Sequence, residues 1–166
     1  MAKLLYFFLS NFEEKHTVPS HKHMCYELVY YTHAKGKSYY QKASSPAKTD
    51  IDFTENAAID RSNLLTFSDN SFIIFPPNVL HDERTERAAS VFSVGFYADT
   101  ETEKDLARFA LKVFTDTDFF IWKYIKSLKI EFSEKSTAIS RCLTVLSPRC
   151  SFRCSAGTMK SLTALE

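Results

Sequence analysis

The sequence predicts a mainly β domain, closed as a barrel or sandwich and followed by two helices. The chain has 166 residues, of which 45% are apolar, and this is enough for one ordinary hydrophobic core. Phe and Tyr are plentiful, at 15 and 8, and aromatic side chains favour pleated, half-buried strands. Short apolar runs separated by turn residues fill the amino-terminal part of the chain, which is typical of sandwiches and barrels.

The expected strands follow one another from the amino terminus. The run at 26–32 is rich in Tyr, Leu and Val, and the Lys35-Gly36 turn signal precedes a return strand. The run at 71–75 is apolar on both faces, so we expect it to be buried, and Pro76-Pro77 ends it. Polar residues 11–19 and 42–62 are expected mostly as loops. In order, the expected strands cover residues 4–9, 26–32, 37–41, 64–67, 71–75 and 90–97, with a weak one near 51–53.

After Tyr97 the hydrophobic period becomes helical. A Thr-Glu-Thr-Glu run at 100–103 resembles a capping box and opens the first helix. Its apolar residues are Leu106, Phe109, Ala110 and Val113. A second helix is expected after Asp118, and its apolar stripe consists of Trp122, Ile125, Leu128 and Phe132, flanked by Ile121 and Tyr124.

This second stripe has two interpretations. It packs either on the barrel within one chain or on the same stripe of a second copy, because large apolar patches are seldom left exposed on monomers. We expect a homodimer, so the predicted organisation comprises three segments. These are a barrel over residues 1–100, a helical dimerisation segment over 101–135 and a basic, Ser/Thr-rich tail of uncertain structure over 136–166.

The charge balance argues against a nucleic-acid-binding body. The chain has 21 basic and 20 acidic residues; removing the four basic residues and one acid of 136–166 leaves 17 and 19, a net of −2 for 1–135. No stretch is long enough to cross a membrane, and the apolar run at 4–9 is too short for a signal peptide. The four cysteines form no CxxC pair, so a cytoplasmic location is the expectation.

The residues that carry chemistry begin with His21, His23 and Glu27. If 21–27 is one regular strand, these odd-numbered side chains share a face, together with Cys25. Two imidazoles and a carboxylate on one face can bind a divalent metal such as Zn, Fe, Mn or Ni. They can equally hydrogen-bond a polyol or a carboxylate ligand, or form a buried cluster that has no present role.

A third imidazole follows the buried strand at 71–75. The segment Pro76-Pro77-Asn78-Val79-Leu80 leads through a tight turn to His81. Asn tolerates the left-handed backbone conformation that such a turn needs where Gly is missing.

Together these two segments resemble a known family. His-x-His-x-x-x-Glu followed by Pro-x-Asn-x-x-His is similar to the two motifs of the cupin superfamily, a jelly-roll barrel. The resemblance implies that His21, His23, Glu27 and His81 are metal ligands. The variant His-x-His-x-x-Tyr-Glu-Leu with Phe-Pro-Pro-Asn-x-x-His is more similar to the sensor domains of AraC-type transcription regulators. That resemblance covers about residues 1–135, and it implies that the two helices carry dimer contacts.

The resemblance leads to one expected function and one alternative. We expect the small-molecule sensing and dimerisation domain of an AraC-type regulator, not an enzyme, with a sugar as one candidate effector. DNA would be bound only through a helix-turn-helix domain that this chain lacks. The alternative is a metal-dependent cupin enzyme of the sugar isomerase or dioxygenase type. The expected ligand-binding residues are His21, His23, Glu27, His81 and Tyr31.

Other chemistry-bearing residues have simpler interpretations. Cys25 is expected to be a buried, inert thiol. His16 and His33 are expected to face solvent, and the charged run at 82–87 is expected to be a solvated loop.

Overall fold

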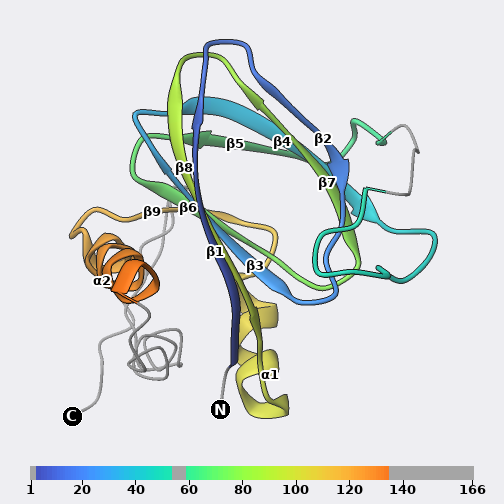
Figure 1. The fold of residues 1–166 in the computed structure, drawn as a ribbon. Helices are drawn as coiled ribbons and strands as arrows, with labels where there is room; N and C mark the ends of the chain where they lie inside the picture. The colour runs from blue at the N-terminus through green and yellow to red at the C-terminus, as the bar shows by residue number, and fades with distance from the viewer. Residues whose placement is uncertain (1–2, 54–58, 135–166) are drawn as a thin grey trace.

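The computed structural model describes residues 3–53 and 59–134, without the side chains of 132–134 (Figure 1). The tail at 136–166, for which a separate segment was predicted, lies outside the described residues. The elements are β1 (Lys3–Phe12), β2 (Thr17–His21), β3 (Tyr26–Thr32), β4 (Lys35–Lys42), β5 (Leu64–Ser68), β6 (Ser71–Phe75), β7 (Val79–Thr85), β8 (Ala89–Tyr97), α1 (Thr100–Phe109), β9 (Val113–Thr115) and α2 (Phe120–Glu134).

The strands form two antiparallel sheets that face each other. One sheet has the order β1-β8-β3-β6-β9 and the other β2-β7-β4-β5, so the chain crosses repeatedly between the sheets. This interleaving of two four-stranded Greek keys is the jelly roll, to which β9 adds an edge strand. The predicted fold class, a mainly β cupin-type jelly roll followed by two helices, is therefore confirmed. None of the described helices is long and apolar enough to span a bilayer.

Several sequence signals correspond closely to the observed elements. The strands predicted at 26–32 and 71–75 are β3 and β6. The turns before β6 and β7 place Asn70 and Asn78 in the left-handed region, with φ of 53° and 61°. Asn supplies this conformation where the sequence offers no Gly.

Two stretches that were predicted as loops are strands instead. Residues 17–21 form β2, and the charged run beginning at Asp82 lies largely within β7. Asp82, Glu83 and Thr85 of this run are buried, whereas Glu86 and Arg87 are exposed. The Asp82 carboxylate accepts from the Tyr39 amide and from Arg84, and the Thr85 hydroxyl donates to the Glu13 carbonyl.

The first helix is shorter than its apolar spacing predicted. Its N-cap is Asp99, whose carboxylate accepts from the Thr102 amide, and the helix ends at Phe109. Leu111 then adopts a φ of 57°, which breaks the helical path. Val113, predicted to lie on the helix, instead begins β9 and pairs with Ile73 of β6.

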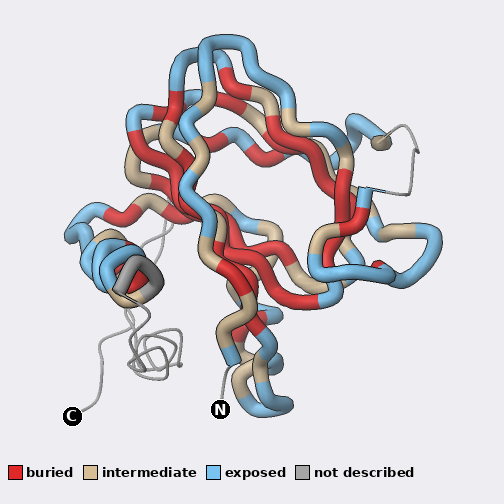
Figure 2. Tube along the Cα trace, in the orientation of Figure 1, coloured by how far each residue is buried: buried red, intermediate tan, exposed pale blue. Residues whose placement is uncertain are grey.

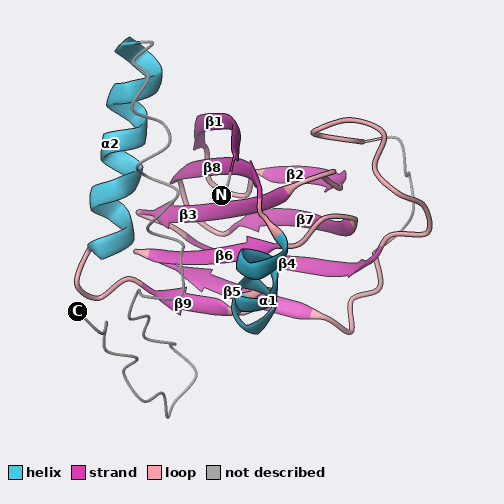
Figure 3. Ribbon diagram, turned by 90° about the horizontal axis from the view of Figure 1, so that it is seen from below, coloured by secondary structure: helices cyan, strands magenta, loops and turns pink. Residues whose placement is uncertain are grey.

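Both helices lie outside the two sheets (Figure 3). The α2 residues Ile121, Ile125 and Leu128 are buried in one apolar cluster with the outer face of the five-stranded sheet. Trp122 stacks on Tyr30 at a centroid distance of 5.6 Å. The described part of the stripe therefore packs on the barrel within one chain, and the predicted homodimer stays a prediction. The side chain of Phe132 lies outside the described residues.

Burial follows this layering: buried residues concentrate in the strands between the layers, and exposed residues lie in the loops and on the helices (Figure 2). Strand β3 is buried at every position because the helices cover one of its faces and the second sheet covers the other. Val29 and Tyr31 belong to a second apolar cluster, between the sheets. This cluster fills part of the barrel interior, and a cavity lined by polar and apolar residues occupies another part.

Candidate metal centre

The four residues predicted as ligands come together inside the barrel. One ligand atom from each of His21, His23, Glu27 and His81 lies within 4.8 Å of the others, and all four side chains are buried. They do not share one strand, as the sequence analysis assumed. His21 ends β2 in one sheet, His23 lies in the connection, and Glu27 belongs to β3 in the opposite sheet. They converge because the two sheets face each other, and His21 pairs directly with His81 of β7.

The closest approaches in this cluster centre on one carboxylate oxygen. The distance from Glu27 Oε2 is 3.0 Å to His23 Nε2 and 3.3 Å to His81 Nε2. Nevertheless all three buried atoms lack a partner in hydrogen-bonding geometry. Short separation without a directed hydrogen bond is the arrangement expected of ligand atoms that point at a common centre.

The opposite ring nitrogens fix the tautomers of the three histidines. A carbonyl oxygen can only accept, so each Nδ1 that contacts one carries the proton, and each Nε2 is left with a lone pair available for a metal ion. Orientation of a ligand imidazole by its other ring nitrogen is typical of metal sites in proteins. The Nδ1–H groups of His21, His23 and His81 donate to the carbonyls of Pro19 at 2.8 Å, Asp50 at 2.8 Å and Val79 at 3.1 Å, respectively.

The electrostatics of the cluster also favour a cation. Burial and the neighbouring His81 lower the pKa of His21 to about 3, which keeps its imidazole neutral. Burial acts most strongly and lowers the pKa of His23, but the charge and hydrogen bond of Glu27, together with the Asp50 carbonyl and Glu83, outweigh it, so this pKa is raised. Burial acts in turn to raise the pKa of Glu27, but His23 and His81 hold it well below its usual range. The four residues therefore fit a divalent cation, with imidazole and carboxylate donors suited to Zn, Fe, Ni or Mn.

A tyrosine that the sequence analysis did not identify supports this cluster. The Tyr6 hydroxyl donates to Glu27 Oε1 at 3.2 Å and lies 3.0 Å from His23 Nδ1. Its ring fits against β8 only because position 95 is Gly: a Cβ there would lie 2.1 Å from the ring. Tyr6 lies in the run that was predicted only as an apolar strand, and one hydroxyl in such a run gives no distinct signal.

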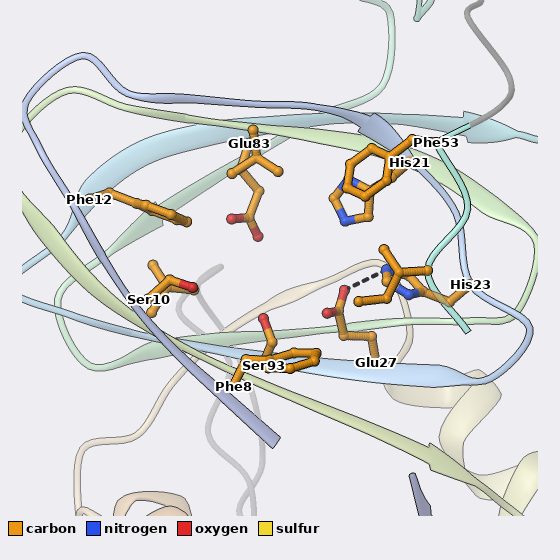
Figure 4. A pocket seen from close by; sticks show the side chains of 12 residues that line it. Phe8, Ser10, Phe12, His21, His23, Glu27, Phe53, Glu83 and Ser93 are labelled. Carbon is orange, nitrogen blue, oxygen red and sulfur yellow. Dashed lines mark ion pairs between the residues drawn. The ribbon is translucent and has the colours of Figure 1, made fainter. Parts of the chain in front are cut away.

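A cavity of about 140 Å³ adjoins the cluster (Figure 4). His21, His23 and Glu27 form one end, and Glu83 and Ser10 lie toward the other, beside Phe12. The complete lining consists of Phe8, Ser10, Phe12, Val18, His21, His23, Glu27, Ile51, Phe53, Glu83, Val91 and Ser93.

Glu83 is the second functional residue that the sequence analysis missed. It was assigned to a solvated loop, although in β7 it lies two residues after His81 and therefore on the same face. Burial and the Glu27 charge raise its pKa to about 8. Tyr31, predicted to bind the ligand, is not among the residues that line the cavity. Its hydroxyl instead donates to Glu83 Oε1 at 2.8 Å.

The remaining predicted chemistry-bearing residues do not belong to the group of four ligand atoms. The Cys25 thiol is buried, and desolvation together with Glu27 raises its pKa to about 11, which makes it a poor nucleophile. His16 and His33 are exposed, as predicted.

Comparison with known proteins finds likeness in fold only. No protein-family model and no curated protein matches the sequence. One similar solved structure is hydroquinone 1,2-dioxygenase PnpCD in complex with Cd²⁺ and 4-hydroxybenzonitrile, at 8% identity and a TM-score of 0.46, covering 56% of this chain and 59% of that one. Another is ycfD from E. coli, at 16% and 0.48, covering 63% and 29%. A third is the cupin-like protein tm1010 from Thermotoga maritima, at 17% and 0.34, covering 60% and 68%.

The chain thus spans about 59% of the length of the dioxygenase chain. The jelly-roll assignment rests on this chain's own strand order.

Proposed function

We propose that this barrel binds a divalent metal ion through His21, His23, Glu27 and His81, and that a small molecule in the adjoining cavity binds at that metal. The observation that carries the proposal is the set of three Nδ1–H bonds to backbone carbonyls, which leaves every Nε2 as a lone-pair donor. A hydrogen-bonded cluster without a metal would pair these nitrogens, whereas two of them are buried without a hydrogen bond.

Other residues of the chain would orient the metal ligands and admit a small molecule to the metal ion. A bound divalent ion supplies a Lewis acid that polarises an oxygen atom of the ligand. Tyr6 orients Glu27, and the ring of Phe75 stacks on His81 at a centroid distance of 3.8 Å, which restricts that imidazole. The cavity lies beside the ligand atoms, so a small molecule can approach the metal from that side.

Metal analysis tests the proposal directly. Protein purified without chelator should contain close to one divalent ion per chain, and chelator treatment should lower its melting temperature because the ion stabilises only the folded state. The variant His23→Ala should abolish stoichiometric binding. The matched control His16→Ala removes an exposed imidazole and should retain the metal. Wild-type protein that takes up no Zn²⁺, Fe²⁺, Mn²⁺ or Ni²⁺ at micromolar concentration would contradict the proposal.

We further propose that the role of this binding is effector sensing, as in AraC-type regulators. The motif variant supports this role, and so does the path from the cavity to α2. Strand β3 carries Glu27 on its inner face and Tyr30 on its outer face. The Tyr30 hydroxyl donates to Asp116, whose carboxylate also accepts from the first amides of α2. A shift of β3 on ligand binding would therefore reach the start of α2.

Trp122 provides the readout for the sensing role. It is the single tryptophan of the chain and lies against Tyr30 and Phe92. Binding of a ligand to metal-loaded protein should change its fluorescence, and Asp116→Ala should weaken that change while leaving ligand affinity in place. A ligand that binds without any change at Trp122 would argue against coupling to α2.

The alternative role, a metal-dependent cupin enzyme, is favoured by the direct contact between the cavity and the ligand atoms. It predicts turnover of a bound ligand, measured as product formation or oxygen consumption by metal-loaded protein. Binding with a Trp122 response and no turnover favours the sensor instead.

A further inference from the structure

The end of the cavity away from His21 and His23 has its own polar groups. Glu83 projects from β7 into the cavity, and the hydroxyls of Ser10 and Ser93 lie on the facing strands β1 and β8 (Figure 4). Within the described residues, neither serine hydroxyl has a hydrogen-bond partner. These groups are therefore available to a molecule that fills the cavity.

Glu83 is held in place without a cation. Its Oε1 accepts the Tyr31 hydroxyl at 2.8 Å, and the Tyr31 ring is fixed by stacking on Phe67 at 3.9 Å between centroids. The neighbouring Arg84 turns to the other face of the strand and pairs with Asp82 at 2.8 Å. Among the described residues that line the cavity, none is Lys or Arg, so a second anion brought here would lack a positive partner.

We propose that Glu83 determines ligand specificity and selects a small molecule that carries a hydroxyl group at the end remote from the metal, against one that carries a second carboxylate. This inference rests on the proposed function, because the other end of the molecule binds the metal. A hydroxyl can donate to a carboxylate or accept from a carboxylic acid, so it pairs with Glu83 in either form. A second carboxylate would be buried beside another acidic side chain, and no Lys or Arg of the described lining would offset its charge.

The apolar residues of the cavity lining indicate which kind of carbon skeleton the ligand has. Phe8, Phe12, Val18, Ile51 and Val91 contribute apolar surface to the lining. With a volume of about 140 Å³, the cavity suits a molecule with a short carbon skeleton. The expected ligand class is therefore a small hydroxylated compound with an oxygen donor for the metal at its other end.

The test uses the full chain loaded with Co²⁺, whose visible absorption reports changes in coordination. Three probes share a carboxylate head and differ at the far end: 4-hydroxybutanoate, butanoate and succinate. Wild-type protein should bind 4-hydroxybutanoate about tenfold more tightly than butanoate, the size expected for one well-formed buried hydrogen bond. Succinate should bind more weakly than 4-hydroxybutanoate by at least the same factor.

Variants separate the contribution of Glu83 from general effects. Glu83→Ala should bring the ratio of the 4-hydroxybutanoate and butanoate affinities close to one. Glu83→Gln, which keeps hydrogen bonding without a titratable group, should retain part of this ratio. Tyr31→Phe frees the Glu83 side chain and should reduce both ratios. Glu86→Gln removes an exposed carboxylate of the same region and should change neither.

The possible outcomes are distinct. If Co²⁺ does not bind, the proposed function fails and this inference fails with it. If Co²⁺ binds but the three probes bind equally or not at all, only the inference about Glu83 is overturned. The inference about Glu83 would also be overturned if Glu83→Ala still preferred 4-hydroxybutanoate to butanoate as strongly as the wild type. Another group would then recognise the hydroxyl.

Discussion

The two faces of strand β3 have opposite characters although their residues alternate along one segment. Tyr26, Leu28 and Tyr30 point outward into an apolar cluster that the helices cover. Glu27 points inward to the three histidines of the candidate metal site, and Tyr31 points inward to Glu83. The outer face excludes water and stabilises the fold, whereas the inner face buries charge next to a cavity. The difference indicates that changes on the outer face should alter folding, and changes on the inner face should alter binding.

The largest expected effect is on the outer face. Ile125→Glu places a carboxylate where the side chain is 2% exposed and should destabilise the protein by about 3–5 kcal/mol, as should Leu128→Glu. Urea denaturation followed by circular dichroism measures this change. The control Ile130→Glu lies on the same helix at 56% exposure and should change stability by less than about 0.5 kcal/mol.

Sedimentation of the same variants tests the predicted homodimer. If Ile125→Glu stays folded and converts a dimer to a monomer, the stripe is an interface between two copies. Its packing on the barrel then contributes little to the stability of the single chain. If the variant unfolds instead of dissociating, the stripe belongs to the core of one chain, and any dimer forms through another surface.

A smaller loss of stability is expected at Gly95, which lies against the Tyr6 ring beside the candidate metal site. In Gly95→Ala, the added methyl group would meet the Tyr6 ring at 2.1 Å, so the ring has to move. Overpacking of this kind costs about 1–3 kcal/mol, and displacement of the Tyr6 hydroxyl should also weaken metal binding. Combining Gly95→Ala with Tyr6→Leu should recover stability but not metal affinity. Recovery of both would show that Tyr6 has no role at the site.

Asp116 joins the outer face of β3 to the start of α2 and should have an intermediate effect. Its carboxylate accepts from the amides of Phe120, Ile121 and Trp122 and from the Tyr30 hydroxyl. Asp116→Ala removes a helix cap together with a buried hydrogen bond and should cost about 2 kcal/mol. Thermal melting beside Asp118→Ala, a change at an exposed carboxylate of the same loop, measures it. Equal melting temperatures for the two variants would mean that the cap contributes nothing.

The sequence was sufficient to predict strands β3 and β6 and the four residues that come together in the cluster. Period-2 and continuous apolar runs identified β3 and β6 because their burial is carried by apolar side chains. The four residues of the cluster were identified through their residue types and the resemblance of the two motifs, and metal binding by them stays a prediction. The single-strand geometry assumed for His21, His23 and Glu27 was wrong. The alternation of side-chain directions along one strand cannot reveal that the chain passes from one sheet to the other between β2 and β3.

The residues that sequence reasoning missed lie on the inner face. Glu83 belongs to a charged run, and such runs usually face solvent, so its burial beside a cavity contradicts the usual pattern. Val113 has helical spacing, but pairing with β6 and the backbone of Leu111 outweigh it. In both cases a contact between segments distant in sequence decides the structure.

The smallest expected change in stability belongs to Tyr6→Phe, which also separates the two faces most sharply. The variant keeps the ring against Gly95 and removes only the hydroxyl that donates to Glu27 at 3.2 Å. Loss of this hydrogen bond should lower the free energy of unfolding by about 1 kcal/mol. Loss of a group that orients a metal ligand should weaken metal affinity by about 10–100-fold. Competition with a chelating dye of known affinity measures the second quantity. Tyr31→Phe is the matched control, because it removes a hydroxyl from the same inner face that contacts Glu83 and not the metal cluster. If both variants weaken metal binding equally, the effect comes from general loosening of the barrel; a loss confined to Tyr6→Phe assigns it to the orientation of Glu27.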